Sequence, residues 1–104
     1  MPFNHTMILY HRTNAAKAIL RNGFRDCKGS YMFEGNFTLR GVFFSDRPLD
    51  CNDGANGDQL LQVTLPDSLD ISAHELIEED KTYREWCIPA QLINRYGLIR
   101  LCDQ

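Results

Sequence analysis

The chain has 104 residues, of which 43% are hydrophobic and 24% are charged, and its 11 basic and 14 acidic side chains leave a formal net charge of −3. This size fits one domain, and this composition predicts a folded globule and excludes a disordered chain. No apolar stretch approaches the ~20 residues of a membrane helix, and the start lacks the features of a secretory signal, so we expect a cytoplasmic protein with no membrane partner. No cluster of Lys and Arg exceeds two adjacent residues, which argues against a broad electrostatic grip on nucleic acid but leaves a site-specific nucleic-acid substrate open.

The first third of the chain predicts a strand followed by a helix. Residues 7–10 form a short apolar run that is typical of a buried strand. Strong helix formers follow at 15–21, with Asn14 in position to act as the N-cap and Gly23 in position to end the helix. Residues 25–38 show weak periodicity and predict a loop, with a short strand near 31–33 as the alternative.

The rest of the chain predicts strands with little helix. Expected strands lie at 41–45, 59–65, 85–88 and 98–101. Residues 46–49 should turn out of the first of these strands, and the glycine-containing segment 50–58 should form a surface loop. Residues 72–81 fit a loop or a short helix, and Pro89 fits the first position of one helical turn. Together these elements predict an α+β domain with one well-defined helix.

Four cysteines are present, and their spacing does not match a metal site or a redox motif. They are Cys27, Cys51, Cys87 and Cys102, and no two of them form a Cys-x-x-Cys pair. Cys87 and Cys102 lie in apolar strand-like runs, as small core residues do. A reducing compartment disfavours disulfides, so we expect four free thiols and no metal.

Three polar segments at the ends of predicted strands resemble motifs of one enzyme superfamily. They are Leu-Tyr-His-Arg-Thr at 9–13, Gly-Val-Phe-Phe-Ser-Asp at 41–46 and Tyr-Arg-Glu-Trp-Cys-Ile at 83–88. In this order they resemble the ADP-ribosyltransferase superfamily, in particular the catalytic domain of the poly(ADP-ribose) polymerases and diphtheria-toxin-like enzymes. The resemblance implies a compact split β-sheet ADP-ribosyltransferase-like fold, with residues 1–104 as a single domain.

The resemblance also implies a reaction and a set of site residues. The implied activity is that of an NAD-dependent mono-ADP-ribosyltransferase or NAD glycohydrolase, for which NAD is the substrate. Cleavage of the nicotinamide–ribose bond creates a ribosyl-cation-like transition state, which a carboxylate stabilises. The implied catalytic residues are Glu85 and His11. The implied NAD-binding residues are His11, Arg12, Thr13, Gly41, Phe43 and Ser45.

Some residues depart from the family pattern and keep other interpretations open. Arg12 stands where the family has Gly, residues 51–57 lack the second stacking aromatic, and Tyr83 replaces the first Glu of arginine-modifying members. One alternative is a catalytically silent domain that binds a nucleotide or a protein. Another is an RNA 2′-phosphotransferase, which needs no acidic catalyst and is therefore disfavoured by Glu85. The acceptor could be a protein, a nucleic acid, a small molecule or water.

The two central side chains also have structural interpretations. His11 fits a core histidine that bonds to the backbone. Glu85 fits a structural ion pair, with candidate partners Arg84, Arg95 and Arg100.

Overall fold

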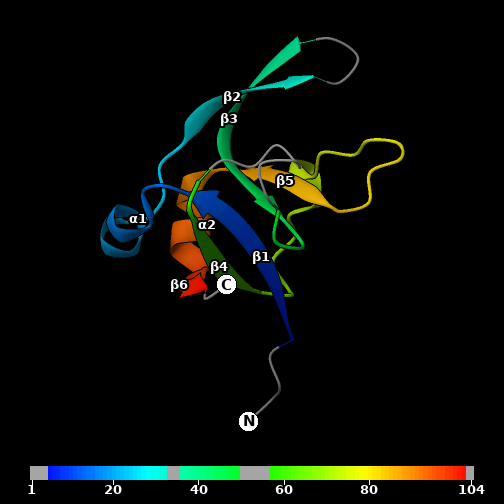
Figure 1. Cartoon of the computed structure of the whole chain (residues 1–104). Helices are drawn as coiled ribbons and strands as arrows, with labels where there is room; N and C mark the ends of the chain where they lie inside the picture. The colour runs from blue at the N-terminus through cyan, green and yellow to red at the C-terminus, as the bar shows by residue number, and fades with distance from the viewer. Residues whose placement is uncertain (1–4, 33–35, 50–56, 103–104) are drawn as a thin grey trace.

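The computed structural model describes residues 5–32, 36–49 and 57–102. These residues form an antiparallel β-sheet with two α-helices and one short 3-10 helix, which confirms the predicted α+β class (Figure 1). The elements in chain order are β1 (Thr6–Thr13), α1 (Ala16–Asn22), β2 (Cys27–Met32), β3 (Asn36–Ser45), β4 (Gln59–Pro66), η2 (Ser72–His74), β5 (Glu85–Ile88), α2 (Ala90–Tyr96) and β6 (Leu98–Cys102). None of the described helices is long and apolar enough to cross a membrane.

The sheet has two halves, and each half is more extensively paired within itself than with the other. β1 and β4 pair along eight residues, from Thr6↔Pro66 to Thr13↔Gln59, and β6 continues this half by pairing with β4. β3 and β5 form the other half, and β2 extends the first part of β3 as a hairpin that projects from the body (Figure 1). In the described residues, the two halves share the single register pair Tyr10↔Ser45.

Side chains alternate between the two faces of this sheet, and one face carries the main core. We call it the helix face, because its residues cluster with Ala16 of α1 and with Ala90 and Ile93 of α2. The strand residues of this cluster are Leu9, Val42, Phe44, Leu61, Val63, Leu65, Trp86 and Ile88. The same core spans both halves of the sheet, so side-chain packing holds them together where backbone pairing does not.

The opposite face is defined by the intervening strand positions. We call it the loop face, and its residues on β1, β3 and β5 are Tyr10, Arg12, Gly41, Phe43, Ser45, Glu85 and Cys87. Leu49, which follows β3, is buried at 6% exposure, and the Arg12 guanidinium donates to its carbonyl. The segment after β3 therefore folds back toward this face.

Polar side chains connect α2 to the segment that directly follows α1. Asn94 of α2 accepts a hydrogen bond from the Phe24 N–H at 2.8 Å and donates to the Phe24 carbonyl at 2.9 Å. Asp26 accepts from the N–H of Ala90 at 2.8 Å and so satisfies a backbone donor at the start of α2. Residues 70 and 64 positions apart in the chain thus fix where α1 and α2 lie.

Several predicted elements are confirmed, and their lengths are corrected. The strand predicted at 7–10 extends over Thr6–Thr13, and the single turn predicted after Pro89 is the two-turn helix α2. The loop predicted for 25–38 is wrong, because β2 and the first part of β3 pair there as a hairpin, and the alternative strand near 31–33 overlaps only the end of β2. This hairpin escaped the prediction because its stability comes from cross-strand pairing, which local periodicity does not record.

Helix α1 begins with different partners from those predicted. Asn14 does not cap it: Ala15 occupies the N-cap position without a side-chain hydrogen bond, and Asn14 Oδ1 accepts instead from the N–H of Asp58. Gly23 ends the helix with φ +86°, as predicted. Cys27 and Cys87 are free thiols, whereas Cys51 and most of the loop predicted at 50–58 lie outside the described residues.

Candidate functional site

The three motifs meet on adjacent strands. β5 pairs with β3, and β3 pairs with β1, so Glu85, Ser45 and Tyr10 form one row across the loop face through the pairs Ser45↔Glu85 and Tyr10↔Ser45. Neighbouring strands lie about 4.8 Å apart, which brings segments separated by 75 residues within about 10 Å of one another. The row crosses the point where the two halves of the sheet join.

Glu85 is held at the start of β5 by a lysine. Lys81 Nζ lies 2.8 Å from Glu85 Oε1 and 3.0 Å from Glu78 Oε2. The side chains of Lys81 and Glu85 are 12% and 18% exposed, so this pair is largely withdrawn from water. A charged pair at this depth needs mutual compensation, which explains why both groups are found together.

The segment before β5 adds aromatic and cationic groups around this pair. The ring of Tyr83 lies 5.3 Å from Lys81 Nζ and 5.0 Å from the guanidinium carbon of Arg47. Arg84, the next residue, points elsewhere: it makes a two-pronged ion pair with Glu75 at 2.7 and 2.9 Å. This pairing lowers the pKa of Glu75 and raises that of Arg84 through their mutual hydrogen bonds.

His11 lies on the helix face, opposite the row that contains Glu85. Its register partner is Leu61, which is fully buried, and its ring contacts Phe24 and Phe44 with centroid distances of 5.2 and 5.6 Å. Burial lowers the pKa of His11, although the backbone hydrogen bond from its ring to Phe43 acts in the opposite direction. The ring is therefore neutral at pH 7.

The hydrogen bond of His11 determines its tautomer. Nδ1 lies 2.7 Å from the Phe43 carbonyl oxygen, which can only accept, so Nδ1 carries the proton. Nε2 of the neutral ring is then an acceptor. The bond links β1 to β3 one residue beyond Tyr10↔Ser45, so His11 continues the junction where the register pairs stop.

Arg12 and Thr13 are committed to local structure. The Arg12 side chain donates to the Leu49 carbonyl, which anchors the segment after β3. Thr13 Oγ1 accepts from the Ala15 N–H at 2.9 Å, which stabilises the turn into α1. The Thr13 backbone is also covered, because a Cβ on Gly57 would lie 2.4 Å from the Thr13 nitrogen.

Two motif residues on β3, Gly41 and Ser45, are enclosed by neighbouring parts of the chain. Gly41 lies against β5, where a Cβ would approach Cys87 Sγ to 2.9 Å and the Ile88 carbonyl oxygen to 3.0 Å. Ser45 is 4% exposed and donates to the Arg47 carbonyl at 2.6 Å. Burial raises the pKa of Cys87, with smaller contributions from Asp26 and Glu85, so this thiol stays protonated at pH 7.

The structure thus brings most of the predicted site residues to one face and places His11 on the other. Arg12, Gly41, Phe43, Ser45 and Glu85 share the loop face, whereas His11 and Thr13 alternate with Arg12 on β1. The partner of Glu85 is Lys81, which replaces the three arginine candidates. Lys81 precedes Glu85 by four residues, and this spacing was the only hint of the pair in the sequence, although the segment is not helical.

The described residues contain no group of three or more His, Cys, Asp or Glu side chains that could hold a metal ion. A pocket of about 420 Å³ lies away from Glu85, between α1 and the start of β4.

No protein-family model, curated protein or solved structure matches the chain.

Proposed function

We propose that this domain cleaves the nicotinamide–ribose bond of NAD, as a mono-ADP-ribosyltransferase or an NAD glycohydrolase, with Glu85 as the catalytic carboxylate. The observation that supports the proposal best is the convergence of the three motifs on β1, β3 and β5, at the sparsely paired junction of the two sheet halves. A split between two halves of a sheet is where the motif resemblance would locate a dinucleotide.

The chemistry assigns a separate task to each group. As the C1′–N bond breaks, its electron pair leaves with neutral nicotinamide, and positive charge develops on the ribose. The Glu85 carboxylate stabilises this charge, and an acceptor oxygen then bonds to C1′ and releases its proton. Phe43, half-buried on the same face as Glu85, offers a ring for the nicotinamide.

His11 would not touch the nucleotide bound beside Glu85, because its ring lies on the opposite face of the sheet, against Phe24 and Phe44. Its Nδ1–H donates to the Phe43 carbonyl and so fixes the backbone of Phe43. His11 is therefore a positioning residue for the nicotinamide side of the site.

The test is release of nicotinamide from NAD by the purified full chain. Glu85→Gln should lower the rate by about 100-fold or more, because the amide cannot stabilise positive charge. Glu79→Gln is the matched control, since Glu79 is exposed and lies in the same acidic segment; its rate should stay within about twofold of wild type. Equal release by the wild type and Glu85→Gln, with both variants folded, contradicts the assignment.

A second candidate is a catalytically silent domain that binds a nucleotide. The observation that favours it is the ion pair at 2.8 Å, because Lys81 already compensates the carboxylate that would face the ribosyl cation. Saturable NAD binding in calorimetry, without nicotinamide release, would select this candidate. Absence of both binding and release would contradict both.

A further inference from the structure

The carboxylate that the proposed chemistry needs is engaged in an ion pair. Lys81 Nζ lies 2.8 Å from Glu85 Oε1, and the two side chains are 12% and 18% exposed. An ammonium at this distance offsets most of the negative charge of the carboxylate. A ribosyl cation that develops beside Glu85 would meet an ion pair with little net charge, so Glu85 cannot stabilise it fully while Lys81 is in place.

Lys81 has a second carboxylate within reach. Its Nζ also lies 3.0 Å from Glu78 Oε2, and the Glu78 side chain, at 35% exposure, is more exposed than that of Glu85. An ammonium has three N–H donors and can bind two carboxylates together or one of them alone. Lys81 can therefore leave Glu85 and keep an ionic partner, which a largely buried cation needs.

The backbone shows which member of the ion pair can move. Glu85 belongs to β5 and is held in the sheet by its register pair with Ser45. Lys81 and Glu78 lie in the segment 76–84, which the structure describes throughout as turns and irregular chain between η2 and β5. A paired strand resists displacement more than such a segment does, so the lysine is the mobile partner.

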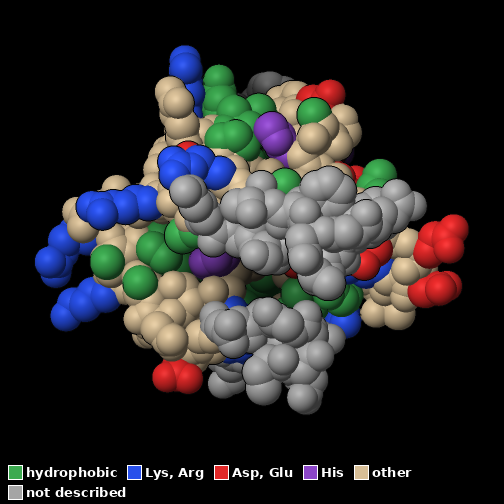
Figure 2. All heavy atoms as spheres, turned by 90° about the horizontal axis from the view of Figure 1, so that it is seen from above, with side chains coloured by type: hydrophobic (Ala, Val, Ile, Leu, Met, Phe, Trp, Pro, Cys, Tyr) green, Lys and Arg blue, Asp and Glu red, His purple; other side chains and the backbone are tan. Residues whose placement is uncertain are grey.

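The segment that carries Lys81 is acidic, and this favours a cation within it. Its carboxylates are those of Glu75, Glu78, Glu79 and Asp80. Figure 2 shows several Asp and Glu side chains projecting on the side where this segment lies in Figure 1. Their field, together with the Tyr83 ring 5.3 Å from Lys81 Nζ, attracts the ammonium even when Glu85 does not hold it.

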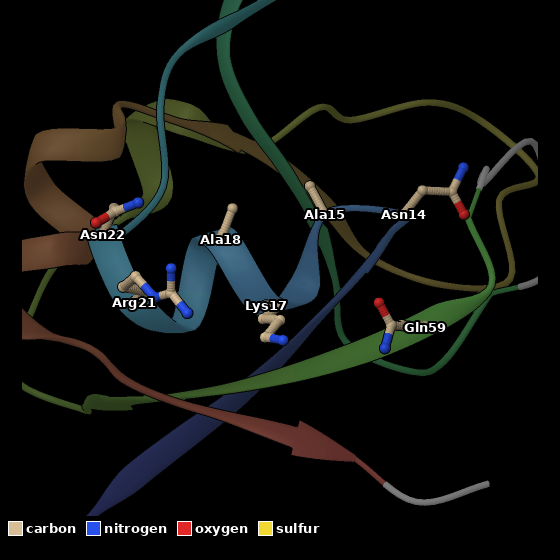
Figure 3. A pocket seen from close by; sticks show the side chains of 7 residues that line it. All are labelled: Asn14, Ala15, Lys17, Ala18, Arg21, Asn22 and Gln59. Atoms are coloured by element: carbon tan, nitrogen blue, oxygen red, sulfur yellow. The ribbon is translucent and has the colours of Figure 1, made fainter.

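The pocket at α1 is a separate feature. Figure 3 shows its lining side chains, which come from α1, from the residues just before it and from the start of β4, and neither Glu85 nor Lys81 is among them. A molecule in that pocket would leave the ion pair intact. The group that opens the pair must instead compete for the Glu85 carboxylate, as a ribose hydroxyl that donates a hydrogen bond does.

We propose that Lys81 is an autoinhibitory residue, whose ion pair masks Glu85 until Lys81 withdraws to Glu78. The inference rests on the proposed NAD chemistry and adds the regulation of that same site. The exchange breaks no covalent bond and moves no proton, because one carboxylate replaces two around the same ammonium. The structure shows the masked form, and the unmasked form is a minor state that NAD selects.

The test is the rate of nicotinamide release by the full chain at saturating NAD. Lys81→Met keeps the apolar bulk of the lysine stem and should raise kcat by about tenfold, because an unmasked form that is about 10% populated becomes the whole population. Lys81→Arg keeps a cation beside the two carboxylates, so its kcat should rise by less than about threefold.

Glu78 offers a variant that keeps the ion pair between Lys81 and Glu85. Glu78→Gln should lower kcat by about fivefold, since it removes the carboxylate that receives Lys81. In Lys81→Met the further change Glu78→Gln should have no effect, because Glu78 acts through Lys81. The control is Glu79→Gln, an exposed position of the same segment, which should stay within about twofold of wild type.

The outcomes separate the autoinhibition from the catalytic assignment. A folded Lys81→Met that is no faster than wild type overturns the autoinhibition, while loss of release in Glu85→Gln still supports the catalytic role. Release that Glu85→Gln leaves unchanged overturns both. If the wild type is silent, release by Lys81→Met supports both proposals, and its silence contradicts both. If Lys81→Met fails to fold, an unchanged rate in Glu78→Gln overturns the autoinhibition.

Discussion

β1 has two neighbours in the sheet, and it joins them in opposite ways. Toward β4 it forms a ladder of eight register pairs, whereas toward β3 the described residues share one pair, Tyr10↔Ser45. The first junction is maintained by backbone hydrogen bonds along its whole length. The second depends on side chains: Phe44 and Leu9 pack in the common core, and His11 bonds to the Phe43 carbonyl.

The difference shows which junction of the sheet depends least on backbone pairing. Parting β1 from β4 would break many backbone hydrogen bonds together, whereas parting β1 from β3 would break few of them but would disrupt the shared core and the bond from His11 to Phe43. The polar row Glu85, Ser45 and Tyr10 crosses the sparsely paired junction.

The largest expected effect comes from removing the aromatic core at the sparsely paired junction. Phe44 is 2% exposed and contacts Phe24 and His11, so Phe44→Ala should lower the free energy of unfolding by about 3–5 kcal/mol. Phe43→Ala, on the half-buried loop face, should lower it by less than half as much. Urea denaturation measures both; equal losses would show that the two faces do not differ as described.

A smaller effect is expected from the ion pair beside this junction. A double-mutant cycle of Lys81→Met and Glu85→Gln should give a coupling of about 1–2 kcal/mol, because both side chains are largely buried. The cycle of Arg84→Met and Glu75→Gln should give less than about 1 kcal/mol, since Arg84 is 62% exposed. A larger coupling for the exposed pair would contradict this ranking, and added salt should weaken the exposed pair first.

The smallest effect is a dependence of stability on pH through His11. Burial lowers its pKa in the folded state from the ordinary 6.5, so below pH 6.5 the unfolded chain binds a proton that the folded chain does not. Stability should therefore fall as the pH drops below about 6.5, by at most about 1.4 kcal/mol per pH unit, and should lose this dependence above it. Urea midpoints at a series of pH values should show the slope in the wild type and a reduced slope in His11→Gln.

The control for the pH experiment is another histidine. His5 is exposed at the start of β1, so His5→Gln should keep the wild-type slope. A slope that disappears with His5, or persists without His11, would show that the junction is not the source of the acid sensitivity.

Local patterns were reliable where one segment dictates its own structure. The alternation in 59–65 predicts β4 almost residue for residue, and Gly23 marks the end of α1, where the backbone needs a positive φ. The hairpin of β2 and β3 was missed, because its strands stabilise each other across the pairing and carry no strong pattern of their own. Asn14 does not cap α1 as predicted, because its side chain accepts a hydrogen bond from the N–H of Asp58, 44 residues away in the chain.

The candidate site could be predicted as a list of residues but not as a geometry. The three motifs mark the strands that converge, yet His11 and Arg12 are neighbours in the chain and point to opposite faces. The partner of Glu85 was expected among arginines and is Lys81, because the chain folds back before β5 and brings that lysine to the carboxylate. Distances of this kind depend on how the segment 76–84 returns to the sheet.

By itself, the sequence determined the α+β class and the positions of most strands, because hydrophobic period and turn residues act over a few positions. Only the tertiary structure decided which strands became neighbours and which face each polar group occupies. These outcomes follow from packing one core between the sheet and two helices, which couples residues far apart in the chain. The row of Glu85, Ser45 and Tyr10 is a product of that packing.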